Sequence, residues 1–243
     1  MKNVFIGIND AGEVIHGHLQ QENATKLIHK GTVDCKSLCS VDYSLDGVIY
    51  AVGCADNSIR IFDETTKSEQ SRLDPGPSTA DTAARVVCTK FIGPHLIASG
   101  GWAKNILIWD LRINQVAQTF VGCHMRGDAI DFKDDRIMAG NYHNEKQIIT
   151  YSLRTGTEMQ SMTVEEVPPV LVLSAQYSKS DRGRRFAFGG SGTNKLFIHD
   201  SESFELIGET PDLPAPIFCL DWASTKNSLA MGLGNGEVHV YDF

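Results

Sequence analysis

Five apolar stretches of the chain share one pattern: apolar residues are followed by an aromatic or similar side chain and then, usually, by Asp. The stretches are Ile59–Asp63, Ile106–Asp110, Ile148–Ser152, Leu196–Asp200 and Val238–Asp242. Their last positions are 42 to 48 residues apart. A strand-like segment that recurs at this period is typical of β-propeller blades, each of which is a small antiparallel sheet.

Three further strand patterns recur at the same period. A short apolar strand ending in an aromatic residue is predicted at Leu38–Tyr43, Val86–Phe91, Ala129–Phe132, Leu173–Tyr177 and Phe218–Trp222. A strand ending in small residues follows at Ile49–Gly53, Leu96–Gly100, Ile137–Gly140, Phe186–Gly189 and Leu229–Gly232. A polar strand follows the Asp at Glu69–Leu73, Gln115–Phe120, Glu158–Met162 and Phe204–Ile207. Small residues suit close packing against the next blade, and polar residues suit an outer edge.

The strand count is uneven at the two ends. Residues 1–30 supply only three strands, Val4–Ile8, Glu13–His18 and Lys26–His29, and the last repeat stops after its third strand. We expect one all-β propeller domain over residues 1–243, with six blades in sequence and incomplete first and last blades, as part of a six- or seven-bladed ring. The blade segments are approximately 1–30, 31–74, 75–121, 122–163, 164–210 and 211–243. The natural chain could be longer, a partner could add a strand at the open edge, or the open edges could dimerise.

The repeats resemble those of the WD-repeat family. Trp109-Asp110 is a literal Trp-Asp, with degenerate forms at Phe62-Asp63, His199-Asp200 and Tyr241-Asp242. Asp56 matches the structural Asp that the family places in the turn before the third strand of a blade. The resemblance covers essentially the whole chain and implies a binding platform rather than a particular activity.

A narrower resemblance is to uncharacterised WD-repeat proteins of ciliated and flagellated cells. It rests on Gly100-Gly101-Trp102, Gly122-Cys123-His124, Gly127–Asp131 and Gly189–Gly192. It implies a cytoskeletal or axonemal partner and a location in the cilium or flagellum.

The charge balance argues against two classes of partner. Thirty acidic and 22 basic residues give a net charge of −8, which disfavours nucleic acids and anionic membranes. No apolar run is long enough to cross a bilayer, and the N-terminus does not read as a signal peptide. Six scattered cysteines without a C-x-x-C pair fit small buried side chains of a cytoplasmic protein.

The sequence contains no motif for catalysis, so we expect neither enzymatic activity nor a cofactor. A nucleophile elbow, a P-loop and H-E-x-x-H are all missing. Gly232–Gly236 lies between two strands and reads as a hairpin turn. His16 and His18 could face a metal, but no third ligand is near in sequence, so packing histidines are favoured and no metal site is predicted. Catalysis would require a buried polar cluster in the central channel.

Candidate partner-binding residues follow from propeller geometry. The loops that enter the first strand of each blade, and the turns between its second and third strands, meet on one face. The residues placed there are Trp102, Lys104, His124, Met125, Arg126, Tyr142, His143, Asn194 and Asn235. Trp, Tyr, Met and Arg are enriched in interface hot spots. Trp102 could instead pack over a blade edge, and the basic cluster Asp181–Arg185 reads as a solvated turn or a phosphate contact.

We therefore predict a non-enzymatic scaffold that binds a protein or peptide through this loop-rich face. The alternative is an architectural subunit of a larger assembly, for example a cytoskeletal or axonemal one, in which strand addition at the open blade edge makes the main contact.

Overall fold

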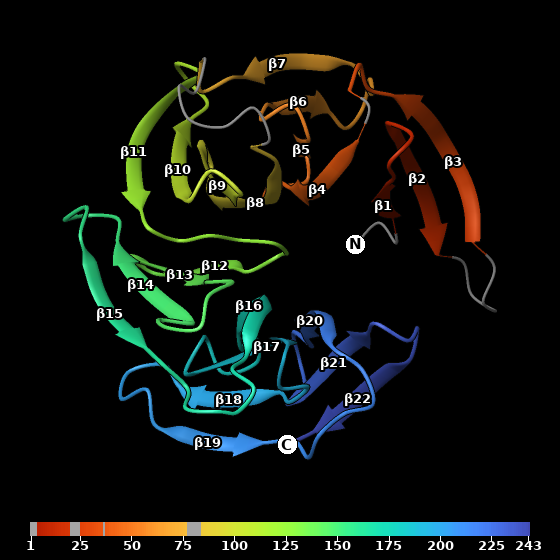
Figure 1. The fold of residues 1–243 in the computed structure, drawn as a ribbon. Helices are drawn as coiled ribbons and strands as arrows, with labels where there is room; N and C mark the ends of the chain where they lie inside the picture. The colour runs from red at the N-terminus through yellow and green to blue at the C-terminus, as the bar shows by residue number, and fades with distance from the viewer. Residues whose placement is uncertain (1–3, 20–24, 36, 77–83) are drawn as a thin grey trace. The chain divides into compact units, whose positions relative to one another are not determined.

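The protein is an all-β molecule in which six antiparallel sheets follow one another along the chain (Figure 1). A computed structural model describes residues 4–19, 25–35, 37–76 and 84–243. These residues contain 22 strands and no helix, and therefore no helix long and apolar enough to cross a membrane. The sheets are successive β-propeller blades, as the sequence predicted.

The chain divides into two compact units, residues 1–103 with 108–117 and residues 104–107 with 118–243. The first three sheets belong mainly to the first unit. Their strands are β1 (Val4–Ile8), β2 (Glu13–Leu19) and β3 (Thr25–Thr32); β4 (Leu38–Tyr43), β5 (Ile49–Cys54), β6 (Ile59–Asp63) and β7 (Glu69–Leu73); and β8 (Val86–Gly93), β9 (Leu96–Gly101), β10 (Asn105–Asp110) and β11 (Gln115–Val121).

The other three sheets lie in the second unit. Their strands are β12 (Ile130–Lys133), β13 (Arg136–Gly140), β14 (Ile148–Ser152) and β15 (Glu158–Met162); β16 (Leu171–Tyr177), β17 (Arg185–Ser191), β18 (Phe197–Asp200) and β19 (Leu206–Glu209); and β20 (Ile217–Trp222), β21 (Ser228–Leu233) and β22 (Val238–Asp242). In each sheet the strands pair in chain order, so every blade is an antiparallel meander.

In the four-stranded sheets the second and third strands are largely buried on both faces, which explains why they lack the alternation of a one-sided sheet. All five residues of β14 are buried, and so are the first four of β6. The fourth strands β7 and β15 are mostly exposed and polar. The hydrophobic and polar pattern of the sequence therefore indicates whether a strand is an inner or an outer strand of its blade.

Within each unit, neighbouring blades are joined through their first strands. The Asp42 carboxylate on β4 accepts a hydrogen bond from the Phe91 backbone N–H on β8 (2.8 Å), and Asp131 on β12 does the same for Tyr177 on β16 (2.8 Å). Ser174 Oγ on β16 accepts from the Leu220 N–H on β20 (3.2 Å). The short polar side chain of one blade thus satisfies a backbone donor of the next.

Glycine at the end of a second strand allows this close approach. A Cβ on Gly189 would lie 2.6 Å from Ile217 Cδ1 of the next blade, and one on Gly140 would lie 2.5 Å from Val172 Cγ1. The predicted role of the small residues in blade packing is therefore confirmed at these positions.

The turn around Asp56 is held by a polar network. Asp56 accepts hydrogen bonds from the Ser58 backbone N–H (3.0 Å) and from the guanidinium of Arg60 (3.4 Å). Arg60 is buried and also pairs with Glu69 on β7. The network ties the turn before β6 to the outer strand.

One predicted strand is displaced. The sequence pattern placed the fourth strand of the fifth blade at Phe204–Ile207, whereas β19 covers Leu206–Glu209. Phe204 closes the preceding turn with a φ of 62°, and its ring packs on Phe186 with centroids 5.2 Å apart. Packing of an aromatic ring therefore delays the start of the strand.

Candidate binding surface

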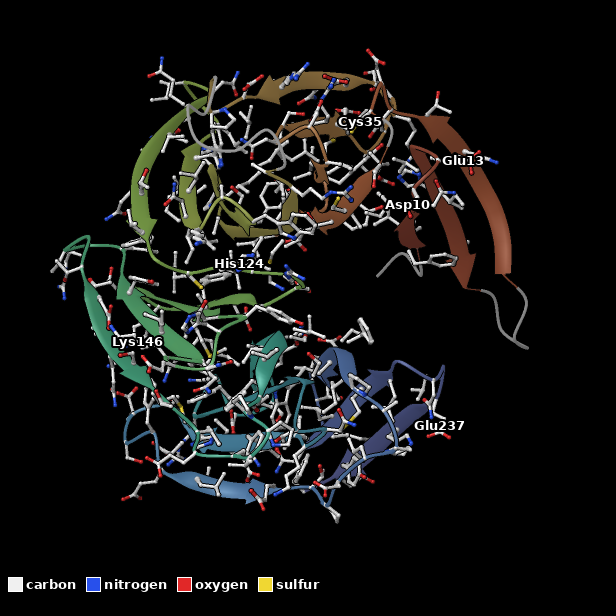
Figure 2. The ribbon with its side chains drawn as sticks, viewed as in Figure 1. Asp10, Glu13, Cys35, His124, Lys146 and Glu237 are labelled. Atoms are coloured by element: carbon white, nitrogen blue, oxygen red, sulfur yellow. The ribbon has the colours of Figure 1, made fainter. Side chains whose placement is uncertain are left out.

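Two loops of the second unit are tied together by backbone hydrogen bonds. One loop leads into β12 and carries His124, which Figure 2 labels; the other is the turn between β13 and β14. The Tyr142 N–H donates to the His124 carbonyl (2.7 Å), and the His124 N–H donates to Oδ1 of the buried Asn141 (3.0 Å). The paired loops hold the side chains of His124 and Tyr142 next to one another.

Arg126, Tyr142 and Ser191 complete the contact. The Arg126 guanidinium carbon lies 4.9 Å from the centroid of the Tyr142 ring, a cation–π distance. The His124 ring meets Tyr142 edge-on at 6.4 Å. The Tyr142 hydroxyl lies 3.4 Å from Ser191 Oγ at the end of β17, in the next blade. The aromatic ring is thus fixed from three sides and half-buried.

Two further basic side chains flank these residues. Lys104 is exposed in the turn between β9 and β10, and its carbonyl accepts from the Gly122 N–H (2.9 Å). His143 is exposed beside Tyr142, and its Nδ1 accepts from the Glu145 N–H (3.2 Å). We call Lys104, His124, Arg126, Tyr142 and His143 the loop cluster; all five belong to the second unit.

The loop cluster is electropositive around His124. Partial burial lowers the pKa of His124, and the positive charges of Arg126, Lys104 and His143 lower it further. The imidazole is therefore held in its neutral form more strongly than a solvated histidine.

The remaining predicted residues of the second unit lie apart from this contact. Met125 is fully buried, so it anchors its loop and offers no surface to a partner. Asn194 Nδ2 donates to the Leu213 carbonyl (3.5 Å), and Asn235 Oδ1 accepts from the Glu237 N–H (3.1 Å). Each asparagine thus stabilises its own loop, and Asn235 is exposed.

Trp102 belongs to the first unit and is half-buried. The Arg85 guanidinium carbon lies 5.3 Å from the centroid of its ring, and the Trp102 N–H donates to the Arg85 carbonyl (3.3 Å). The indole thus packs against Arg85 and keeps part of its surface open.

Sequence reasoning missed Asn141, Ser191 and Arg85. Asn141 follows the small residues at the end of β13, which could have marked it as a loop-holding side chain. Ser191 and Arg85 meet their aromatic partners from 49 and 17 residues away in the chain, and no local pattern signals such pairs.

The basic turn Asp181–Arg185 is partly structural. Arg185 Nε donates to the Asp181 carboxylate (2.7 Å), and its guanidinium lies 5.4 Å from the Trp222 ring centroid. Arg182 and Arg184 remain exposed in the turn.

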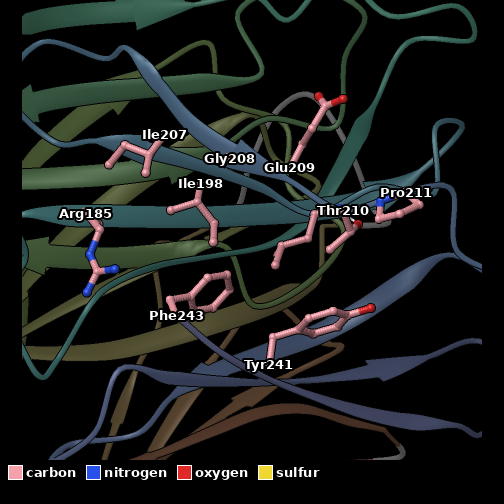
Figure 3. Close-up of a pocket in the computed structure, with 10 residues that line it drawn as sticks. Arg185, Ile198, Ile207, Gly208, Glu209, Thr210, Pro211, Tyr241 and Phe243 are labelled. Atoms are coloured by element: carbon pink, nitrogen blue, oxygen red, sulfur yellow. Dashed lines mark hydrogen bonds between the residues drawn. The ribbon is translucent and has the colours of Figure 1, made fainter.

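A second candidate surface surrounds β22. This strand pairs only with β21 among the described strands, although it is a third strand in the repeat. Val238 and Val240 share one face of β22 and are 72% and 64% exposed. Beside the strand lies a pocket of about 310 Å³, mostly apolar, which Ile198, Ile207, Tyr241 and Phe243 help to line (Figure 3).

Two thiols and a carboxylate in the first unit have the spacing of metal ligands. The ligand atoms of Cys35, Cys54 and Asp56 lie within 4.8 Å of one another. However, Asp56 already accepts from Ser58 and Arg60, and burial raises the pKa of the Cys54 thiol. A protonated thiol beside a guanidinium is a poor ligand set for a cation, so the group is explained as packing.

His16 also has a structural explanation. Its side chain is buried, with Nε2 3.1 Å from a Glu64 carboxylate oxygen that also accepts from the Tyr43 hydroxyl. The ring meets Tyr50 edge-on at 5.2 Å. His16 therefore links β2 to the second blade.

Comparison with known proteins places this architecture in a family. Residues 25–63 match the family model described as WD domain, G-beta repeat. The match runs from β3, the outer strand of one blade, to the end of β6, the third strand of the next, and so covers one sequence repeat. No curated protein matches the chain. Together with the six blade sheets, the match over these residues supports a WD-repeat β-propeller architecture. Proteins of this family generally act as scaffolds for protein interactions.

Proposed function

We propose that this protein is a non-enzymatic scaffold, located in the cytoplasm, that binds a protein or peptide partner through its blade loops. The observation that carries the proposal is the loop cluster, in which a half-buried Tyr142 is fixed between Arg126 and His124 on a rigid blade framework. Aromatic and Arg side chains held rigid before binding lose little entropy on association and are typical hot spots. We propose Trp102 as a further contact in the first unit, and Asn194 and Asn235 as polar contacts of neighbouring loops.

The test compares partners recovered by the wild-type chain and by loop variants. We expect Tyr142→Ala to weaken a specific partner by about 2 kcal/mol, roughly thirtyfold in Kd, because it removes the aromatic anchor. Affinity capture with quantitative mass spectrometry would find candidates, and calorimetry with each purified candidate would measure the loss. Lys226→Glu, at an exposed position in the connection between β20 and β21, is the control. A partner that binds Tyr142→Ala and the wild type equally would contradict the proposal.

A second function is favoured by the open edge of β22. An extended segment of a partner could pair with β22 as the fourth strand of its blade and place apolar side chains in the pocket beside Tyr241 and Phe243. The protein would then be an architectural subunit of a larger assembly, of which a cytoskeletal or axonemal one is an example. Trp102→Ala and Tyr142→Ala should leave such an assembly intact, while Val240→Pro should disrupt it, because proline removes a backbone donor and distorts an edge strand.

A further inference from the structure

The sulfur atoms of two cysteines in the first unit lie close together. Cys35 is half-buried in the connection between β3 and β4, whereas Cys54 is the last residue of β5 and is fully buried. Their sulfurs lie within 4.8 Å of one another, and both thiols are free. A disulfide bond is about 2.05 Å long, so the sulfurs need to approach by less than about 3 Å. A change of side-chain rotamer is enough for such a movement.

The Ser37 carbonyl holds the two cysteines in neighbouring places. It accepts a hydrogen bond from the Cys35 thiol (3.3 Å) and another from the N–H of Ala55, the residue after Cys54 (2.9 Å). Leu38 is the register partner of Cys54 in the pairing of β4 with β5. If the Cys35 side chain turns towards Cys54, the carbonyl keeps its bond from Ala55 and is not left unpaired.

The backbone of the connection that carries Cys35 is fixed. The Val33 N–H donates to the Gly12 carbonyl (2.8 Å), and the Asp34 carbonyl accepts from the buried guanidinium of Arg60 (3.1 Å). A Cβ on Gly12 would lie 2.5 Å from the Cys35 carbonyl oxygen, so the connection packs against the turn between β1 and β2. This fixed backbone keeps the two thiols within reach of each other, which favours a reaction between them.

We propose that Cys35 and Cys54 form a reversible disulfide when hydrogen peroxide oxidises the chain, and that this bond locks the first blade to the second. The Cys35 sulfur attacks the peroxide and takes one oxygen to become a sulfenic acid, with release of water. The Cys54 sulfur then attacks the Cys35 sulfur: the S–S bond forms, the S–O bond breaks, and the hydroxyl leaves with the Cys54 proton as water. Two thiols are oxidised, and one peroxide is reduced to two waters.

The surroundings of the two thiols determine the order of these steps. Burial raises the pKa of the Cys54 thiol, and the nearby negative charges of a Cys35 thiolate and of Asp56 raise it further. Cys54 is therefore protonated and closed to an oxidant in solution, whereas Cys35 reaches the solvent. A second thiol beside a sulfenic acid converts it to a disulfide before it is oxidised further. Cys54 is placed for that role.

The bond would restrict the chain at the junction of two blades. It closes a loop over residues 36–53, which contains β4 and all but the last residue of β5. A disulfide stabilises a fold mainly by restricting the unfolded chain. We expect the oxidised chain to melt several degrees above the reduced chain, and dithiothreitol to reverse the shift. The thiol pair belongs to the first unit and the loop cluster to the second, so this oxidation does not depend on the proposed scaffold function.

The experiment maps the bond after mild treatment of the reduced, folded chain with hydrogen peroxide. Remaining thiols are blocked before the chain is unfolded, so that no exchange occurs during digestion. Trypsin cuts after Lys36 and so separates Cys35 from the other two cysteines of this region. Chymotrypsin cuts after Tyr43 and separates Cys39 from Cys54. We expect mass spectrometry to find the Cys35 peptide linked to the Cys54 peptide, with the loss of two hydrogens.

Three variants separate this bond from other oxidation. Cys39→Ser is the matched control, because Cys39 is also half-buried and its sulfur lies 4.0 Å from the same Ser37 carbonyl oxygen. It should keep both the bond and the melting shift. Cys35→Ser changes a half-buried side chain and should lose both, with a reduced melt like that of the wild type. Cys54→Ala should lose both as well, and its reduced melt tests its folding.

Several outcomes would overturn the proposal. A bond between Cys35 and Cys39, or between cysteines of two chains, would show that another thiol is the partner. Recovery of Cys35 as a sulfinic acid, with Cys54 still reduced, would show that Cys54 does not react with it. A mapped bond without any difference between the oxidised and reduced melts would overturn the locking of the two blades.

Discussion

His199 occupies the position at the end of a third strand that Trp109 holds two blades earlier. Trp109 Nε1 donates to Ser99 Oγ (2.9 Å), as an indole N–H can. The His199 ring stacks against both Phe186 and Phe188, with centroids 5.5 and 5.6 Å away, and its Nδ1 lies 2.9 Å from the Phe204 carbonyl oxygen. Since a carbonyl only accepts, Nδ1 carries the hydrogen, and Nε2 is buried without a hydrogen-bond partner among the described residues. The degenerate His-Asp of the sequence therefore keeps the aromatic packing of a Trp-Asp but adds a titratable group.

This burial predicts an acid-sensitive blade. Burial lowers the pKa of His199, and the hydrogen bond to the Phe204 carbonyl opposes that shift. Above a pH of about 6.5 the ring is neutral in both states; below it, the unfolded chain takes up a proton that the folded chain resists, so stability falls as the pH falls. We expect His199→Phe to reduce the loss of unfolding free energy between about pH 7.5 and about pH 5.5, measured by urea denaturation. His143→Gln, at an exposed histidine, is the control, and an equal effect of both variants would contradict the prediction.

At the scale of residues, the sequence predicted the positions of the loops at the site but not the burial of each side chain in them. The apolar-to-polar pattern located the loops that carry His124 and Tyr142, because loop position follows from strand position. It also placed Met125 in the binding surface, whereas the structure buries that side chain completely. Whether a loop residue points inward depends on its contacts with distant segments, which a one-dimensional pattern does not contain.

At the scale of elements, the repeat predicted strands well and missed their irregularities. A register shift interrupts the pairing of the first and second strands at the same place in four blades, between Leu38 and Ser40, Val86 and Cys88, Val172 and Ser174, and Ile217 and Cys219. A β-bulge inserts one residue and increases the local twist. In all four blades an aliphatic residue precedes the shift and a Ser or Cys follows it, so the irregularity has a local pattern that the search for strand periodicity did not use.

Close blade packing predicts unequal costs for two glycines of one blade. A Cβ on Gly189 of β17 would press on the side chain of Ile217, at 2.6 Å from Cδ1 and 3.1 Å from Cβ, while one on Gly208 of β19 would meet nothing within 4 Å. We expect Gly189→Ala to lower the free energy of unfolding by about 1–3 kcal/mol through overpacking. Gly208→Ala should change it by no more than about 0.5 kcal/mol. Urea denaturation of both variants would decide, and equal costs would show that the blades do not pack as tightly as described.

At the scale of the whole molecule, the repeat period of 42 to 48 residues predicted the fold class. It also predicted the three-stranded first and last sheets, which the structure contains. That the chain is one domain stays a prediction. Complete blades end in polar fourth strands such as β7, whereas the last sheet ends in β22, whose valines would be flanked by a fourth strand in a complete blade. An apolar third strand at an edge is an aggregation hazard that proteins normally cover.

Because β22 pairs only with β21 among the described strands, we expect the 243-residue chain to self-associate when no partner is present. Val238 and Val240 expose 72% and 64% of their surfaces on one face of β22, and pairing of edge strands between two copies would bury them. We expect light scattering to give a mass above 26.7 kDa that rises with concentration, and the Val238→Lys, Val240→Lys double variant to return it to the monomer value with an unchanged melt. Val121→Lys, at a valine that is 74% exposed on the four-stranded third blade, should leave the association intact. A wild-type mass that stays at the monomer value at every concentration would show that β22 does not mediate self-association. It would also remove the main evidence for an architectural subunit.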